Sequence, residues 1–193
     1  MVKKANTLSI DAALHSVISF VSASLGYAYL LQGRPEAALP VLMEAVKPQN
    51  IKSSITPSIY PFATLAEVYR MTGRIAEANR TVDEALRIFR QTEERCFGAW
   101  ALFVKAKIQS EDSSGQIEQA ATTYHQVMEL ADELKLRPLL AHCHLRLGQF
   151  YLKKGKTQNA QSEFQNAIER YRSLGMEFWL PEAEALLQGI SPA

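Results

Sequence analysis

A short pattern of apolar and small residues occurs three times along the chain. In each copy a leucine is followed by a tyrosine four positions later, by a glycine after four more, and by an alanine after a further five. Self-similarity of this kind predicts a repeated unit of secondary structure, and it constrains the fold more strongly than composition does. The three copies are Leu25, Tyr29, Gly33 and Ala38; Leu65, Tyr69, Gly73 and Ala78; and Leu147, Tyr151, Gly155 and Ala160.

Each position in the pattern has a physical reason that indicates two packed helices. Residues four apart lie on one face of an α-helix, so the leucine and the tyrosine pack together. The glycine supplies the left-handed conformation with which many helices end. The alanine falls in the next helix, where a small side chain lets two helices approach closely, and Gly26 and Gly148 fit the same role in the first helix. The sequence therefore predicts an all-α fold built from helix–turn–helix hairpins.

These hairpins resemble the tetratricopeptide repeat, a unit of about 34 residues with the signature W-x2-L-G-x2-Y, then A-x3-F, then P. The signature Trp and Pro are absent from all three copies, and the segment between the second and the last copy is a degenerate repeat. The best match places five residues at signature positions: Leu147, Gly148, Tyr151, Ala160 and Phe164.

The resemblance implies a right-handed α-solenoid of about four hairpins with a C-terminal capping helix. Pro181 suits the first turn of that last helix, and Gly189 suits its end. The expected organisation is an N-terminal tail over 1–10 and a single domain over 11–193, with repeats at about 19–52, 59–92, 97–134 and 138–174 and the capping helix at 180–189.

A second resemblance covers roughly residues 96–188. The stretches "LRPLLAHCHLRLGQFY" and "AIERYRSLGMEFWLPEAEALL" resemble the C-terminal repeat region of large bacterial regulators. Those proteins join a nucleotidyl cyclase or similar output domain to an ATPase and then to tetratricopeptide repeats. The resemblance implies a bacterial signalling context, and the catalytic parts of such regulators are missing from this sequence.

Three residues, Gly155-Lys156-Thr157, match the end of a phosphate-binding loop. The full motif needs a glycine at position 150, where the sequence has Phe150, and it needs a strand before it. We therefore interpret Gly155 as a helix cap. His142 and His144 are two positions apart, so on a helix they point to nearly opposite sides and cannot share a metal ion. With no nucleophile motif either, we expect no cofactor, no metal and no enzymatic activity.

The resemblance to tetratricopeptide repeats implies a concave groove lined by the first helix of each hairpin. Lys and Asn residues clamp a carboxylate in some members of that family, but Ala23, Tyr27, Thr64 and Trp100 occupy the corresponding positions here. Aromatic residues in a groove are typical anchors for a peptide, although the same rings could simply pack between repeats. The candidate groove residues are Phe20, Tyr27, Tyr60, Glu67, Arg70, Trp100, Lys107, Gln149 and Lys153.

Charge excludes some partners. The sequence has 21 basic and 20 acidic side chains and a formal net charge of +1, so we expect no binding to nucleic acid. No Asp, Glu, Lys or Arg occurs between Ala12 and Gly33, but four serines in that stretch argue against a membrane span. We expect the apolar segment 11–31 to be covered by a preceding repeat, by a partner, or by a second copy of the chain.

The sequence as a whole predicts a cytoplasmic, non-catalytic scaffold for protein interaction. Its two cysteines, Cys96 and Cys143, are too few and too far apart for a disulfide framework and fit a reducing compartment. The partner would be a protein or peptide bound in the concave groove. The alternatives are a sensor whose groove accepts a small peptide or metabolite, and a module for self-association.

Overall fold

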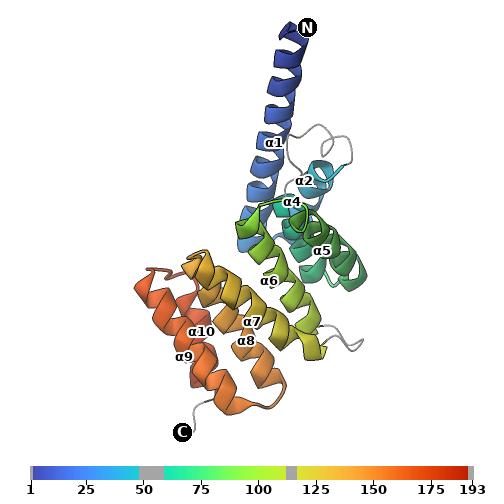
Figure 1. Ribbon diagram of the computed structural model, residues 1–193. Coiled ribbons are helices and arrows are strands. Elements are labelled where there is room, and N and C mark those ends of the chain that lie inside the picture. The colour runs from blue at the N-terminus through green and yellow to red at the C-terminus, as the bar shows by residue number, and fades with distance from the viewer. Residues whose placement is uncertain (1, 48–58, 112–116, 191–193) are drawn as a thin grey trace. The chain divides into compact units, whose positions relative to one another are not determined.

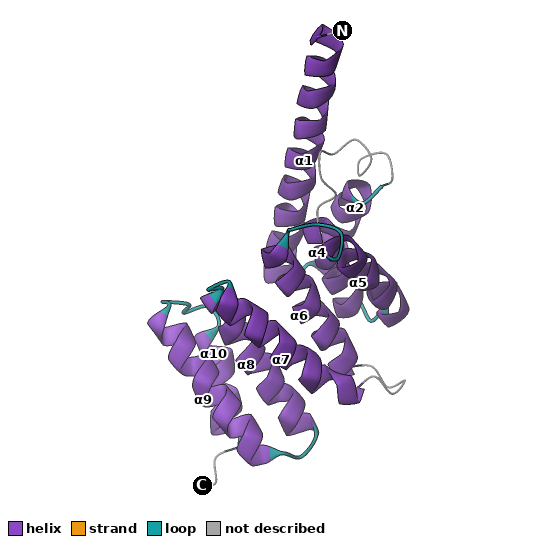
Figure 2. Cartoon of the chain, viewed as in Figure 1, coloured by secondary structure: helices purple, strands orange, loops and turns teal. Residues whose placement is uncertain are grey.

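The computed structural model describes residues 2–47, 59–111 and 117–190, and these ranges contain nine α-helices and no β-strand (Figures 1 and 2). The predicted all-α fold is therefore confirmed for the described chain. The protein consists of two compact units, an N-terminal unit, Met1–Ile108, and a C-terminal unit, Gln109–Ala193. Parts of two expected repeats, 48–52 and 112–116, lie outside the described residues.

The N-terminal unit contains two helical hairpins. α1 (Val2–Leu31) packs against α2 (Pro35–Ala45), and α4 (Ile59–Met71) packs against α5 (Ile75–Phe89). Both helices of the first hairpin also contact α4, so the hairpins stack on one another. The next helix, α6 (Arg95–Glu111), crosses the boundary into the C-terminal unit.

α1 is longer than we predicted. It has 30 residues, whereas α4 has 13, and Figure 1 shows its N-terminal half projecting beyond α2. The helix begins at Val2, so residues 2–10, which we expected to form an N-terminal tail, are helical. None of the described helices combines the length and the apolarity that crossing a membrane requires.

The C-terminal unit contains α7 (Ile117–Glu133), α8 (Arg137–Lys153), α9 (Thr157–Ser173) and the short α10 (Leu180–Gln188). α8 packs against α7 and α9, and α10 packs against α9. Pro181 lies in the first turn of α10, and Gly189 follows its last residue.

The turns inside the hairpins confirm the role predicted for the repeated glycine. Gly33, Gly73 and Gly155 have φ values of 68°, 74° and 70°, a conformation that favours glycine. In each turn the residue after the glycine donates its N–H to the carbonyl of the pattern tyrosine, at 2.8–2.9 Å. This six-residue loop is the Schellman ending of a helix, and it satisfies carbonyls that would otherwise lack partners.

In the C-terminal unit the same turn also joins one hairpin to the next. Lys135 and Gly175 have φ values of 58° and 65°, and the residues after them donate to carbonyls five positions earlier at 2.8 and 2.9 Å. Turns therefore recur every 20 residues, since 155 − 135 = 20 and 175 − 155 = 20. A hairpin here takes 40 residues, compared with about 34 in the signature.

Small residues let the helices of each hairpin approach, as predicted. A Cβ atom built on Gly26 would lie 2.8 Å from Leu42, and one on Gly148 would lie 2.6 Å from Phe164. Gly98 makes a third close approach, because its Cβ would lie 2.3 Å from the ring of Phe89. At each of these three positions a residue larger than glycine would force the facing side chain to move.

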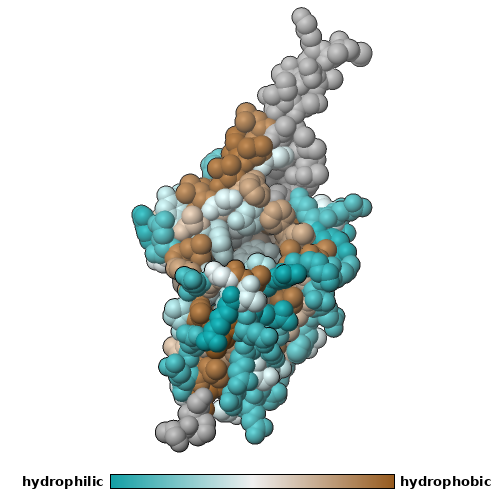
Figure 3. Space-filling model, turned by 90° about the vertical axis from the view of Figure 1, so that its left-hand side faces the viewer, coloured by the Kyte–Doolittle hydropathy of each residue, from teal (hydrophilic) through white to brown (hydrophobic). Residues whose placement is uncertain are grey.

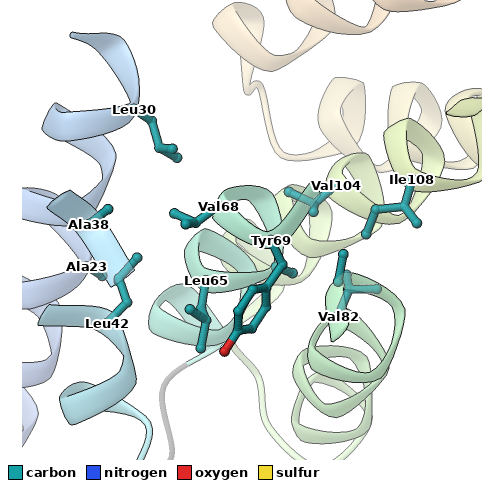
Figure 4. Packing of buried hydrophobic residues seen from close by; sticks show 12 residues of the cluster. Ala23, Leu30, Ala38, Leu42, Leu65, Val68, Tyr69, Val82, Val104 and Ile108 are labelled. Carbon is teal, nitrogen blue, oxygen red and sulfur yellow. The ribbon is translucent and has the colours of Figure 1, made fainter. Parts of the chain in front are cut away.

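One buried cluster joins the helices of the N-terminal unit. Figure 4 shows Leu65, Val68 and Tyr69 of α4 lying between residues of the first hairpin and residues of α5 and α6. The other labelled members are Ala23, Leu30, Ala38, Leu42, Val82, Val104 and Ile108. The apolar faces of five helices thus close into one core, which fixes the helices that carry the candidate site.

Candidate binding surface of the N-terminal unit

Aromatic rings from α1, α4 and α6 meet near the first turns of α4 and α6. Tyr60 of α4 stacks on Phe97 of α6, with ring centroids 5.0 Å apart and planes 17° apart. Phe20 of α1 contacts both rings, at 5.6 Å from Tyr60 and 6.3 Å from Phe97. The side chain of Phe20 nevertheless remains half exposed, at 50%. We call Phe20, Tyr60 and Phe97 the aromatic platform.

A second group of rings lies further along the same helices. Tyr27 of α1 meets Trp100 of α6 edge to face at 5.6 Å, and Trp100 lies 5.5 Å from Phe103. Tyr27 and Trp100 are partly buried, and Phe103 is buried. The indole Nε1 of Trp100 is buried without a hydrogen-bond partner in the part of the chain that the structure describes. This group mainly packs successive repeats together.

Three charged candidates, on α4 and α6, form one buried cluster. Arg70 donates two hydrogen bonds to Glu67, from Nε to Oε2 at 3.0 Å and from Nη2 to Oε1 at 2.9 Å, and Lys107 of α6 forms an ion pair with the same carboxylate. Burial by itself would raise the pKa of Glu67, but the two cations outweigh it and lower the pKa to about 2. Glu67 is therefore ionised, and its charge joins α4 to α6.

Seven of the nine predicted groove residues lie in the N-terminal unit, and each contacts at least one other residue of the two ring groups or the charged cluster. Their exposure differs from one residue to the next. Glu67 is only 6% exposed, so this side chain supports the surface and does not project from it. Phe20 is the predicted residue with the largest exposed ring. The seven are Phe20, Tyr27, Tyr60, Glu67, Arg70, Trp100 and Lys107.

Sequence reasoning missed Phe97. This residue precedes Trp100 by three positions, which places both rings on one face of α6. The helical spacing could have identified it. The degenerate third repeat obscured the register, because it offers no Leu-x3-Tyr-x3-Gly pattern to align.

The last two predicted residues, Gln149 and Lys153, belong to the C-terminal unit. Gln149 accepts a hydrogen bond from Arg146 at 2.8 Å and donates one to Glu182 of α10 at 3.1 Å. Lys153 donates to the carbonyl of Ser110 at 3.1 Å. Gln149, which we assigned to the groove, thus bonds to the terminal helix α10.

The remaining candidate sites have structural partners. Lys156 lies over the ring of Tyr151, with Nζ 5.9 Å from its centroid, in the turn between α8 and α9. His142 Nδ1 lies 2.8 Å from the hydroxyl of Tyr171, and His144 Nδ1 lies 2.6 Å from Glu163 Oε2, so the two histidines have different neighbours. No group of metal-binding side chains occurs among the residues that were placed. Burial raises the pKa of the Cys143 thiol, which keeps it protonated.

Comparison with known proteins agrees with this architecture. Residues 141–174 match the tetratricopeptide repeat family. Over 169 residues the chain is 25% identical to "Protein KINESIN LIGHT CHAIN-RELATED 3" of Arabidopsis thaliana, and it covers 25% of that protein's length. The aligned part is 83% of this chain. The chain therefore spans about a quarter of this curated relative.

Two crystal structures have the same kind of fold. BtubC (BKLC) of P. vanneervenii aligns with a TM-score of 0.67 at 17% identity, over 95% of this chain and 82% of that one. A putative kinesin light chain of Podosopora anserina with nearly identical TPR-like repeats aligns with a TM-score of 0.55 at 16% identity, over 88% and 93% of the two chains. These likenesses establish a fold of helical repeats of the tetratricopeptide type.

Proposed function

We propose that the chain is a non-catalytic scaffold that binds a protein or peptide through the aromatic platform of its N-terminal unit. The observation that carries the proposal is the state of Phe20. Its ring rests on two further rings and still presents half of its surface. An exposed aromatic side chain that is already held in place can bury apolar area on a partner at little cost in conformational entropy.

The surroundings of the platform support this role. Ion pairs and ring contacts hold α1, α4 and α6 in fixed register, so the surface is formed before a partner arrives. Such preorganisation favours binding, because fewer side chains must be ordered on association. We expect the partner to place an apolar side chain on Phe20 and to surround it with polar contacts at the rim.

We also propose a regulatory setting in the cytoplasm of a bacterium. The resemblance of residues 96–188 to the repeat regions of bacterial regulators supports it. The similarity to proteins described as kinesin light chains supports the scaffold role alone, because repeat folds of this type carry unrelated partners.

The test is affinity capture with three forms of the chain, followed by quantitative mass spectrometry. Phe20→Ser removes the exposed ring, and Phe178→Ser is the matched control, because Phe178 is 70% exposed and lies in the C-terminal unit. We expect the captured amount of at least one protein to fall about tenfold or more with Phe20→Ser, which corresponds to a loss of roughly 1.4 kcal/mol or more of binding free energy. The captured amount of that protein should stay constant with the control. Equal capture by all three forms would contradict the proposal.

A further inference from the structure

α1 carries a second apolar surface beside the platform. Five aliphatic side chains on it are 43–58% exposed, although exposed aliphatic side chains usually occur singly on a monomer. Figure 3 shows hydrophobic residues gathered along this helix. We call them the α1 seam: Leu14, Val17, Ile18, Val21 and Leu25.

The seam lies on the side of α1 opposite its core. Ser19, Ala23, Gly26 and Leu30 are buried and succeed one another at spacings of four, three and four residues. The seam repeats this spacing through 14, 18, 21 and 25, half a helical turn away. Alternating steps of four and three place side chains in a stripe that packs against another helix. α1 therefore has two such stripes, and within the described chain only one is covered.

Residues at the same repeat positions are buried in the C-terminal unit. The repeat aligns Leu25 of α1 with Leu147 of α8, so Val17, Ile18 and Val21 correspond to Leu139, Leu140 and Cys143. Those four α8 residues are 0–6% exposed, because α8 packs against α7 as well as against α9. The α1 seam is thus a helix-stacking face that has no facing helix among the residues that the structure describes.

We propose that the α1 seam pairs with the α1 seam of a second copy of this chain. The area is sufficient: five aliphatic side chains about half exposed present on the order of 500 Å² per copy, so a pair buries about 1,000 Å², the lower bound for a specific interface. The chemistry is self-complementary, since no charged residue occurs between Ala12 and Gly33 to repel its own counterpart. Val17, Ile18 and Val21 are also β-branched, so their side chains lose little freedom on packing.

A two-fold pairing uses the same residues on both chains and closes the assembly at a dimer. The net charge of each chain, +1, opposes this association only weakly. The dimer does not depend on the aromatic platform. Phe20 follows Val17 by three positions and borders the seam, but its ring packs on Tyr60 and Phe97.

The test measures the mass of the whole 193-residue chain by sedimentation equilibrium and by light scattering across roughly 1–100 µM, the range in which weak dimers form. The expected result is a monomer–dimer equilibrium in which Val21→Glu raises the dissociation constant about 100-fold or more. Met43→Glu is the matched control, since Met43 is 49% exposed and lies on α2, outside the seam. It should leave the dissociation constant within about twofold.

Three further results complete the design. Phe20→Ser should leave dimerisation intact, which separates this inference from the proposed binding function. Val21→Asn, a neutral variant, should also weaken the dimer, and circular dichroism should show unchanged helix content in every variant. A chain that stays monomeric throughout, as it would if another protein covered the seam, or a dimer that Val21→Glu leaves unaffected, would overturn the inference.

Discussion

Small and large side chains face each other inside the hairpins, and their sizes vary together. Gly26 faces Leu42 and Gly148 faces Phe164, each at a distance that leaves no room for a Cβ atom. The corresponding pair in the second hairpin is Ala66 and Val82, both fully buried. In that hairpin alanine adds a methyl group relative to glycine, and the facing Val82 is smaller than Leu42 or Phe164. The alanine that replaces the signature glycine is therefore compensated by a smaller side chain opposite it.

This pairing predicts a coupled response to mutation. Gly148→Ala gains about 1 kcal/mol in helix propensity, but the new Cβ would push against the buried ring of Phe164 and cost about 1–3 kcal/mol. We expect a net loss of unfolding free energy in urea titrations. In the Phe164→Val background, which reproduces the second hairpin, Gly148→Ala should become neutral or stabilising.

The control for this cycle is Gly155→Ala. Gly155 has a φ of 70° and nothing within 4 Å of its Cβ position, so alanine there is strained by its backbone and not by Phe164. Phe164→Val should not relieve that strain. If Gly148→Ala lowered the unfolding free energy equally in the wild-type and the Phe164→Val backgrounds, the size pairing would be disproved.

Among the elements, the turns are the most regular part of the protein. In the three turns that follow a pattern tyrosine, a basic residue comes after the glycine and lies over the tyrosine ring. Arg34, Arg74 and Lys156 lie 5.4, 4.4 and 5.9 Å from the ring centroids. A Schellman ending usually brings two apolar side chains together at these positions, and here a cation–π contact replaces them. This accounts for the Gly-Lys pair that resembled a phosphate loop.

One turn lacks the residue that its geometry favours. Lys135 is the residue other than glycine with a positive φ, 58°, among those described, and its side chain is exposed. The left-handed conformation costs about 1 kcal/mol for a residue with a Cβ atom. Lys135→Gly should therefore raise the unfolding free energy by about 0.5–1 kcal/mol, as measured by thermal and urea denaturation. Lys135→Ala removes the charge and keeps the strain, so no gain is expected from it.

The elements could be predicted from the sequence because their signals are local. A leucine, a tyrosine and a glycine at fixed spacing determine one helix face and one helix end, and the structure has turns at all three glycines. The turn at Lys135 carried no glycine and so gave no signal. The start of α1 at Val2 was not predicted, because the uncharged apolar stretch that marked the helix begins only at Ala12.

At the scale of the whole molecule, contacts between successive repeats matter more than long-range topology. Within the N-terminal unit each repeat is held by its neighbour, as expected for stacked repeats. Glu67 makes one such link in the N-terminal unit, because its carboxylate joins Arg70 on its own helix to Lys107 on α6. A buried carboxylate with two cations is worth most when it is ionised.

This link predicts a pH-dependent loss of stability. The pKa of Glu67 in the folded chain is lowered from 4.5 to about 2, so its contribution is complete above pH 4.5 and disappears as the pH falls toward 2. Glu67→Gln should lower the unfolding free energy by about 2–3 kcal/mol at pH 7. The difference in unfolding free energy between wild type and variant, measured by urea titration, should decrease as the pH is lowered from 4.5 to 2.

An exposed ion pair provides the comparison. Glu84 bonds to Arg87 at 2.6 Å, but its side chain is 40% exposed. Glu84→Gln should therefore change the unfolding free energy by less than about 0.5 kcal/mol. If both variants lost the same amount, or if the gap for Glu67→Gln did not change with pH, the ionised cluster would not hold the repeats together.

The candidate site was less predictable than the fold. The resemblance to a repeat family named residues on the first helix of each hairpin, and seven of them do meet in the N-terminal unit. Their exposure could not be read from the sequence, because the burial of Glu67 depends on Lys107, 40 positions away. Gln149 and Glu182 are 33 positions apart in the sequence, so local patterns could not predict their contact either.

The even spacing of turns in the C-terminal unit bears on how such chains grow. Lys135, Gly155 and Gly175 place the same loop at both ends of α8 and of α9. Duplication of any 40 consecutive residues from this region would keep the 20-residue spacing of turns across the new junction, whichever residue the duplicated segment began with. Slippage during replication could lengthen or shorten the array by whole hairpins without creating a new kind of junction.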